Sequence, residues 1–199
     1  MRRPLNKVNF LLCGVGGQGT ILASDVLALV GVQAGYDAKK AEVHGMAQRG
    51  GSVTSHVRWA EKVTSPLTAL GEVDMLIAFE KLEALRYIEF LRPGGTVLAN
   101  DHKIIPITVT SGGAHYPDND RLRALLAEVT ENVLWLDGIA IAEELGSVRG
   151  ANVVLLGALS ALLEVPESTW LEVIEQRVPE RFAELNRNAF RRGRAATSR

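Results

Sequence analysis

Short apolar runs alternate with amphipathic segments along the chain, beginning near its start. Residues 8–13 (VNFLLC) are apolar except for Asn9 and precede Gly14–Gly19, six residues that include four glycines. Apolar residues then recur at helical spacing until Gly35 ends the pattern, at Ile21, Leu22, Val26, Leu29 and Val30. The order of buried strand, glycine turn and helix is typical of the first half of a βαβ unit.

The rest of the chain continues this alternation of strand and helix patterns. Further strands are predicted at residues 38–43, 52–59, 75–79, 96–99, 104–109 and 133–136. Further helices are predicted at residues 80–91, 121–131, 138–145, 150–163, 170–178 and 179–190. The pattern predicts an α/β fold with a Rossmann-like, mostly parallel sheet, helices on both faces and a helical C-terminal part. No composition break divides the chain, so we expect a single domain over residues 1–199.

Three local features refine this prediction. Alternation in 52–59 predicts a half-exposed strand, with Thr54, His56 and Arg58 on its open face. Pro106 makes 104–109 an edge strand or an extended segment, because proline cannot donate to a ladder. A capping box, Thr169-x-x-Glu172, is expected to begin the helix at 170–178.

Composition narrows the class of protein. Apolar residues make up 47% and charged residues 23% of the 199 positions, which is ordinary globular usage. Lys and Arg number 22 against 23 for Asp and Glu, so no basic field exists to attract nucleic acid or a membrane surface. Outside the glycine-rich start, the longest uncharged apolar run, residues 153–163, is shorter than the ~20 residues that span a bilayer. We therefore expect a cytoplasmic protein.

The cysteine and histidine positions argue against a metal site. A single cysteine, Cys13, excludes a disulfide within the chain and a zinc or iron–sulfur site built from several cysteines. The four histidines lie far apart in the sequence. Glu80, Glu83 and Glu89 are interpreted as a solvated helix face.

The glycine turn matches the dinucleotide fingerprint, with Gly14-x-Gly16-x-x-Gly19 placed between a strand and a helix. Glycines let a phosphate approach the helix N-terminus, whose free N–H groups and dipole favour an anion. The candidate residues for binding a phosphate are Gly14, Gly16, Gly17, Gln18 and Gly19. Asp37 and Glu42 are candidates for holding a ribose, although neither ends an apolar strand. The alternative is that the glycines only permit tight packing.

A second glycine-rich segment has the composition of a binding loop. His44–Gly51 (HGMAQRGG) holds a base, a fixed cation and an amide close together. Its alternative interpretation is an ordinary exposed connection. Next to it we expect Met46, Val53 or Trp59 to form an exposed apolar patch that binds a partner or a second copy of the chain. Residues 187–199 contain five arginines and no acid, which predicts a solvated tail or a contact with an anionic partner.

Five segments together resemble one family over residues 8–193. They are GVGGQGT, EVHGMAQRGGSVTSHVR, FEKLEALRY, RGANVVLLGAL and ELNRNAF. The chain is similar to the gamma-type subunit or domain of the 2-oxoacid:ferredoxin oxidoreductases, above all in the branch that acts on indolepyruvate. The glycine turn alone is only weak evidence for this family. The segment MAQRGG at this distance after the turn is specific to it.

The resemblance implies a subunit of an oxidoreductase that is inactive on its own and supplies no catalytic residue. Family members decarboxylate a 2-oxoacid on thiamine diphosphate and magnesium, pass electrons through iron–sulfur clusters to ferredoxin, and transfer the acyl group to coenzyme A. The larger catalytic subunit would hold these cofactors, and this chain would hold none and no metal. The glycine turn would bind coenzyme A. Six residues would face the partner or the acyl-transfer site: His44, Met46, Gln48, Arg49, Gly50 and Gly51.

Two other functions remain open. One is a nicotinamide-dependent dehydrogenase, for which the sequence offers no substrate domain and no acid–base residue in a suitable context. The other is a Rossmann-like nucleotide-binding or assembly module without catalysis of its own.

Overall fold

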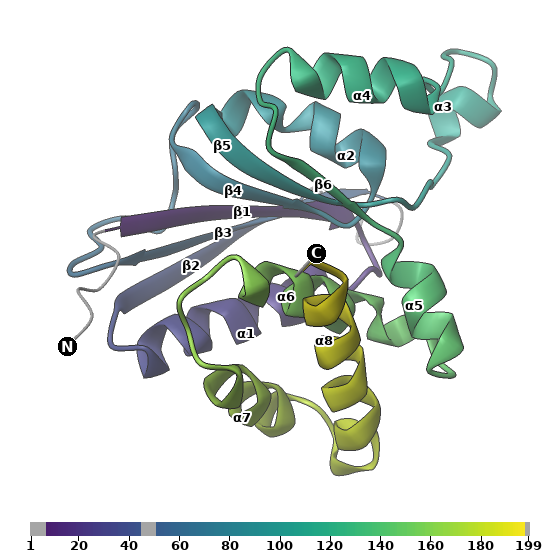
Figure 1. The fold of residues 1–199 in the computed structure, drawn as a ribbon. Helices are drawn as coiled ribbons and strands as arrows, with labels where there is room; N and C mark the ends of the chain where they lie inside the picture. The colour runs from purple at the N-terminus through teal and green to yellow at the C-terminus, as the bar shows by residue number, and fades with distance from the viewer. Residues whose placement is uncertain (1–6, 45–50, 198–199) are drawn as a thin grey trace.

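A single six-stranded sheet organises the protein, for which a computed structural model describes residues 7–44 and 51–197. The strands are β1 (Lys7–Val15), β2 (Asp37–His44), β3 (Ser52–Ala60), β4 (Val73–Ala78), β5 (Leu91–Asn100) and β6 (Val133–Leu136). Their order across the sheet is β2-β3-β1-β4-β5-β6 (Figure 1). The pairs β1/β4, β4/β5 and β5/β6 are parallel, and β3 is antiparallel to both β1 and β2. Only β3 is therefore reversed, which confirms a mostly parallel sheet.

Helices cover both faces of this sheet (Figure 1). One face carries α1 (Thr20–Gln33), α5 (Gly138–Glu144), α6 (Ala151–Ala161), α7 (Glu167–Arg177) and α8 (Ala183–Thr197). The other carries α2 (Lys81–Arg86), α3 (Ile107–Thr110) and α4 (Asn119–Ala127). Three short 3-10 turns complete the described elements: η1 (Ile88–Phe90), η2 (Val148–Gly150) and η3 (Glu180–Phe182). The helical C-terminal part thus lies on one face.

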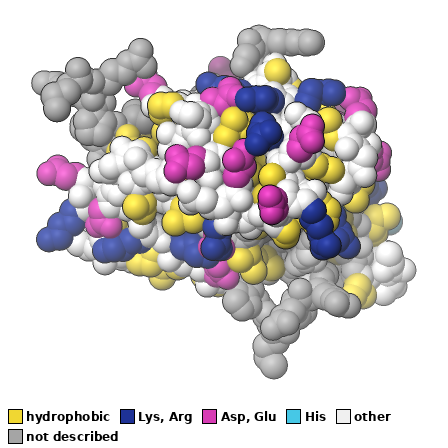
Figure 2. All heavy atoms as spheres, turned by 90° about the horizontal axis from the view of Figure 1, so that it is seen from below, with side chains coloured by type: hydrophobic (Ala, Val, Ile, Leu, Met, Phe, Trp, Pro, Cys, Tyr) yellow, Lys and Arg dark blue, Asp and Glu magenta, His cyan; other side chains and the backbone are white. Residues whose placement is uncertain are grey.

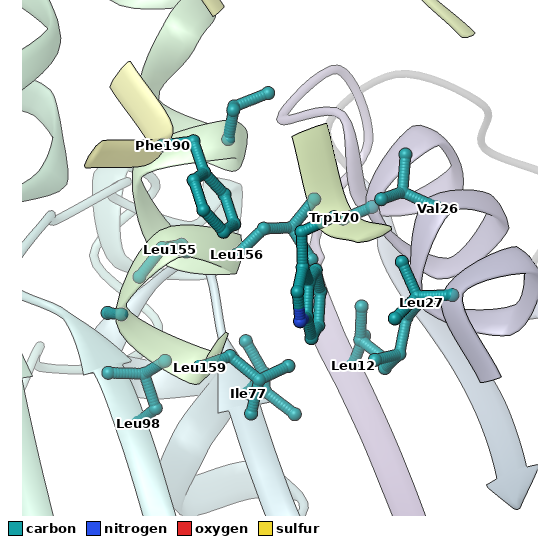
Figure 3. Packing of buried hydrophobic residues seen from close by; sticks show 14 of the residues in the cluster. Leu12, Val26, Leu27, Ile77, Leu98, Leu155, Leu156, Leu159, Trp170 and Phe190 are labelled. Carbon is teal, nitrogen blue, oxygen red and sulfur yellow. The ribbon is translucent and has the colours of Figure 1, made fainter. Parts of the chain in front are cut away.

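The larger core lies between the sheet and α6. All residues from Ala151 to Ser160 in this helix are buried, as its nearly uninterrupted apolar sequence predicts. Figure 3 shows the packing of Leu12, Ile77 and Leu98 from three strands against α6, together with Trp170 of α7 and Phe190 of α8. A smaller core under α2 and α4 is built around Leu11, Leu76, Val97 and Leu126.

Two glycines let α6 and α8 come into backbone contact. A Cβ added to Gly157 would lie 2.0 Å from the carbonyl oxygen of Phe190, and one added to Gly193 would lie 1.9 Å from that of Val154. Arg194 donates to the Ser160 carbonyl oxygen at 2.8 Å across the same contact. The expected solvated tail is therefore wrong through residue 197, because this segment packs as a helix against the core.

The structure corrects three of the predicted elements. Residues 104–109 form no strand, because β6 takes the place beside β5 and Pro106 instead stands at the N-cap of α3. The capping box is also wrong, since α7 begins at Glu167 after Pro166 and has no side-chain cap. The helix predicted at 80–91 ends at Arg86, and β5 begins at Leu91.

The expected open face of β3 is covered: Thr54 and His56 are buried and Arg58 is half-buried, because Thr68 of the connection after β3 and Phe90 of η1 pack against His56. The Thr68 N–H donates to Nδ1 of His56 at 3.3 Å, and burial lowers the pKa of this imidazole. Val53 and Trp59 are 7% and 0% exposed, so the predicted apolar patch does not form from them. Met46, its third member, lies outside the described residues.

No helix in the described part of the chain has the length and apolar character needed to cross a membrane.

We expect Gly157→Ala to lower the melting temperature markedly, because its methyl group would push α8 away from α6. Overpacking of this kind costs roughly 1–3 kcal/mol of unfolding free energy. Thermal unfolding followed by circular dichroism measures the effect. The matched control is Asn188→Ala on the exposed side of α8, which should leave stability nearly unchanged. Equal melting temperatures for the two variants would contradict the close helix contact.

Candidate functional site

A cavity of about 400 Å³ opens at one edge of the sheet. Strands β1, β2, β4, β5 and β6 all run in one direction, so their carboxyl ends meet at this edge, on the right of Figure 1. The chain leaves β1 toward α1 on one face and leaves β4 toward α2 on the other (Figure 1). Ligands of open α/β sheets bind outside the carboxyl ends of the strands at such a switch point.

The glycine turn forms one wall of this cavity. Glycine is required at its positions for two different structural reasons. Gly19 has φ 81° and Gly17 has φ 106°, a left-handed region that favours glycine. Gly14 has an ordinary φ but no space, since a Cβ there would lie 2.9 Å from the Cβ of Phe79. The turn is thus pressed against the end of β4.

The Gln18 side chain holds the turn closed. Its Oε1 accepts a hydrogen bond from the Val15 N–H at 2.7 Å, and its Nε2 donates to the Phe79 carbonyl oxygen at 2.9 Å. Because both ends of the amide are engaged with the backbone, Gln18 braces the junction between β1 and β4. The Gln18 amide therefore forms hydrogen bonds within the protein at both its oxygen and its nitrogen.

The N-terminus of α6 closes the cavity from the other side. Asn152 packs so closely on the turn that a Cβ on Gly19 would lie 2.4 Å from its Nδ2, which donates to the Gly19 carbonyl oxygen at 3.4 Å. Gly19 and Gly150 are the N-caps of α1 and α6, and neither helix has a side-chain cap. Two helix N-termini, each carrying a positive partial charge, therefore border the same space.

The remaining lining residues add cationic and neutral polar groups. Arg149 is exposed at the mouth, and His102 is half-buried beside it. No ion pair recorded for the described residues involves Arg149. Among the described lining residues none is acidic, and Phe79, Ile104, Ile139 and Val148 supply apolar surface. This cavity suits a ligand that combines an anionic group with an apolar part.

A second cavity of about 370 Å³ lies beside the first and shares Ile104 with it. Its floor contains Glu80 and Glu83, which are 1% and 3% exposed. Their interpretation as a solvated helix face is therefore wrong for both. Glu80 caps α2 by accepting from the N–H groups of Leu82 and Glu83 at 2.7 and 3.0 Å.

The other oxygen of Glu80 fixes the chain that follows β5. It accepts from the Ile104 N–H at 3.2 Å and from the Tyr116 hydroxyl. Burial, with the Glu80 hydrogen bond second, raises the pKa of Tyr116 well above its usual value, so the hydroxyl stays protonated as the donor. Glu83 accepts from Arg86 Nε at 2.9 Å and from the Ser52 hydroxyl. The carboxylates of this second cavity are thus engaged in structural bonds.

The structure brings part of the two predicted binding segments together. The Gly16 N–H donates to the Gly51 carbonyl oxygen at 2.9 Å, which joins the glycine turn to the end of the second segment. His44 is the last residue of β2 and pairs with Val53 at the same edge. Met46, Gln48, Arg49 and Gly50 lie outside the described residues.

Neither candidate for a ribose-binding acid is free. Asp37 lies at the opposite end of β2 and accepts from the Val63 N–H at 2.8 Å. Glu42 is paired with Lys40. Sequence reasoning missed Arg149 and Asn152, which lie in the quoted segment RGANVVLLGAL but more than 120 residues beyond the turn. Asn152 contacts the turn and Arg149 lines the same cavity, and this proximity is visible only after folding.

The residues of this chain do not fit an iron–sulfur cluster. Such clusters need several thiolates, and the sequence has one cysteine. Cys13 is buried in β1, donates weakly to the Glu83 carbonyl oxygen at 3.5 Å, and has its pKa raised by burial. Within residues 7–44 and 51–197, no cluster of three potential His, Cys, Asp or Glu ligands occurs.

Comparison with known proteins places this fold among oxidoreductase subunits. The indolepyruvate oxidoreductase subunit IorB of Archaeoglobus fulgidus is 40% identical over 191 residues, covering 94% of each chain. A keto/oxoacid ferredoxin oxidoreductase gamma subunit from Geobacter sulfurreducens superposes with a TM-score of 0.71 at 26% identity, over 96% of this chain and 98% of that one.

A longer protein contains the same fold. The 2-oxoglutarate:ferredoxin oxidoreductase of Magnetococcus marinus matches with a TM-score of 0.73 and 24% identity, over 97% of this chain but only 31% of its own. The model for pyruvate ferredoxin/flavodoxin oxidoreductase matches residues 9–196. Since that match covers nearly the whole sequence, the chain belongs to the pyruvate ferredoxin/flavodoxin oxidoreductase family.

Proposed function

We propose that this chain is the small subunit of an indolepyruvate:ferredoxin oxidoreductase, which decarboxylates an aryl pyruvate to an acyl-coenzyme A. The observation that carries this proposal is the 40% identity, over 94% of both chains, to a subunit named for indolepyruvate. Residues 1–199 act as one domain in this proposal, supported by the single sheet to which both helix layers pack.

The larger subunit would hold thiamine diphosphate, magnesium and the iron–sulfur clusters and would pass electrons to ferredoxin. The single buried cysteine supports this division, since this chain cannot ligate a cluster. The same free thiol fits a reducing compartment, and we place the complex in the cytoplasm.

We further propose that the glycine-turn cavity binds the phosphates of coenzyme A. Three features support this: two helix N-termini border the cavity, Arg149 is exposed in its lining, and none of the described lining residues is acidic. The turn residues Gly14, Gly16, Gly17, Gln18 and Gly19 shape this wall, with Gln18 bracing it through the bonds to Val15 and Phe79. His44, Met46, Gln48, Arg49, Gly50 and Gly51 belong to the segment assigned to the partner or the acyl-transfer site.

A nicotinamide-dependent dehydrogenase is a weaker alternative, because Asp37 and Glu42 are engaged elsewhere and no ribose acid faces the turn in the described chain. A fluorescence titration with reduced nicotinamide discriminates the two functions. Our proposal predicts no saturable binding.

Reconstitution tests the proposed function. We expect the isolated chain to oxidise no 2-oxoacid, because the redox groups lie elsewhere. Together with the larger subunit, it should support indolepyruvate-dependent reduction of a viologen dye that requires coenzyme A. Faster turnover of pyruvate or 2-oxoglutarate would contradict the substrate assignment and leave the class of reaction intact. Full activity of the larger subunit alone would contradict the proposal.

Arg149→Ala should raise the KM for coenzyme A by about tenfold or more in the reconstituted complex. Loss of a hydrogen bond to a charged group costs about 1.5–3 kcal/mol, and 1.4 kcal/mol is a factor of ten. Arg149→Lys should recover only part of the affinity, since an ammonium cannot form the bidentate pair. Arg181→Ala, which removes the same charge at η3, is the matched control. An unchanged KM in Arg149→Ala would place the phosphates elsewhere.

Arg49→Ala should leave the melting temperature of the isolated chain nearly unchanged, as surface substitutions usually do. In the complex it should lower turnover or weaken coenzyme A saturation by roughly tenfold, because a guanidinium in a glycine-flanked segment can pair bidentately with a phosphate or carboxylate. Steady-state kinetics and thermal unfolding measure both effects, and Arg49→Lys should restore only part of the activity. If Arg49→Ala unfolds the chain, or leaves the complex fully active, the segment His44–Gly51 has a structural role and its assignment to the site is wrong.

A further inference from the structure

Five exposed apolar side chains lie at the edge of the sheet where the two cavities open. We define the apolar rim as Ile21, Val43, Ile105, Ile107 and Val148. These residues come from separate stretches of the chain: the start of α1, the end of β2, the segment after β5 and η2. Val148 lines the first cavity, and Ile105 and Ile107 line the second. Three of the five rim residues therefore line the cavities, and Ile21 and Val43 lie at the same edge of the sheet.

The most exposed part of the rim is held in place by buried bonds. Ile107 is 83% exposed and begins α3, directly after Pro106 at its N-cap. The preceding Ile104 is fixed by its N–H bond to the buried Glu80, which also accepts from Tyr116. Proline and these bonds keep Ile105 and Ile107 from folding inward. Rigid apolar groups of this kind lose little conformational entropy when a partner covers them.

The outer face of the C-terminal helices has the opposite character. Figure 2 shows basic and acidic side chains beside one another there, and ion pairs join Arg177 to Asp25, Arg187 to Glu175 and Arg191 to Glu167. These pairs leave a charged, solvated surface. Interfaces are depleted of such charges at their centres, so the apolar rim is the better docking surface.

We propose that the apolar rim docks the larger subunit of the complex, so that the cavity of the small subunit opens directly into the interface. This inference rests on the proposed function. A chain that cannot ligate an iron–sulfur cluster must present its bound substrate to the subunit that holds the redox groups, and the cavity opens at this edge.

Two observations favour the larger subunit over a second copy of this chain. The same fold occupies 31% of the longer Magnetococcus marinus chain, where it is joined covalently to further sequence. A symmetric dimer through the rim would bring the two cavities, each with an exposed Arg149 and two helix N-termini, toward one another. Like charges that face each other in this way oppose association.

The test measures the affinity of the full-length chain for the purified larger subunit by calorimetry. Ile105→Asp and Ile107→Asp should each weaken binding at least tenfold, because docking would bury an unpaired carboxylate. Both side chains are exposed in the free subunit, at 51% and 83%, so the melting temperatures should stay close to that of the unaltered chain. The matched control is Leu70→Asp, 59% exposed in the connection at the opposite edge of the sheet, which should bind within about twofold.

The outcomes separate this inference from the proposed function. If both rim variants bind the larger subunit as tightly as the chain without substitutions, and that chain supports 2-oxoacid oxidation, the rim is not the docking surface but the proposed function stands. Failure of the unaltered chain to bind the larger subunit or to support oxidation would overturn both. Light scattering measures whether the isolated chain forms a dimer. If Ile107→Asp dissociates such a dimer but binds the larger subunit with unchanged affinity, the rim binds a second copy of this chain and the proposal is wrong.

Discussion

The turn between β1 and α1 depends on the absence of side chains where three elements meet. Gly14 lies against Phe79 at the end of β4, and Gly19 lies against Asn152 at the start of α6. A Cβ on Gly14 would clash with Phe79 and with Gln18 of the turn itself, and a Cβ on Gly19 would push the turn away from the start of α6. The same close contact places the N-terminus of α6 beside that of α1, and the cavity exists because both helices begin there.

This arrangement differs from dinucleotide binding although the glycine spacing is the same. Gln18 spans the turn and satisfies backbone groups of Val15 and Phe79. No free acid follows β2 to hold a ribose, since Asp37 lies at the far edge and Glu42 pairs with Lys40. The described lining of the cavity instead includes a cationic residue, Arg149. A common motif is thus combined with a different set of partners, which is why the fold alone could not define the ligand.

Two buried carboxylates, those of Glu80 and Glu83, form hydrogen bonds around the second cavity at the same edge of the sheet. Glu80 accepts bonds from α2, from Ile104 and from Tyr116, and Glu83 accepts from Arg86 and Ser52. Buried charges of this kind persist only when they are well paired, and removal of a partner is costly. Glu80 thereby fixes the chain after β5 at Ile104, next to the exposed Ile105 and Ile107, whereas Glu83 joins α2 to Ser52 at the start of β3.

The sequence by itself determined the alternation of strands and helices, the glycine turn and the buried α6, because these depend on residues close together in the chain. It also excluded a cluster site, since that requires only a count of cysteines. The tertiary structure alone decided that the expected open face of β3 is covered, because Thr68 and Phe90, which contact His56 there, come from later segments of the chain. It likewise decided that Asn152 meets Gly19, 133 residues away, and that Arg149 stands at the cavity mouth. Local periodicity reflects neighbouring residues, whereas a site is assembled from distant segments whose proximity only packing creates.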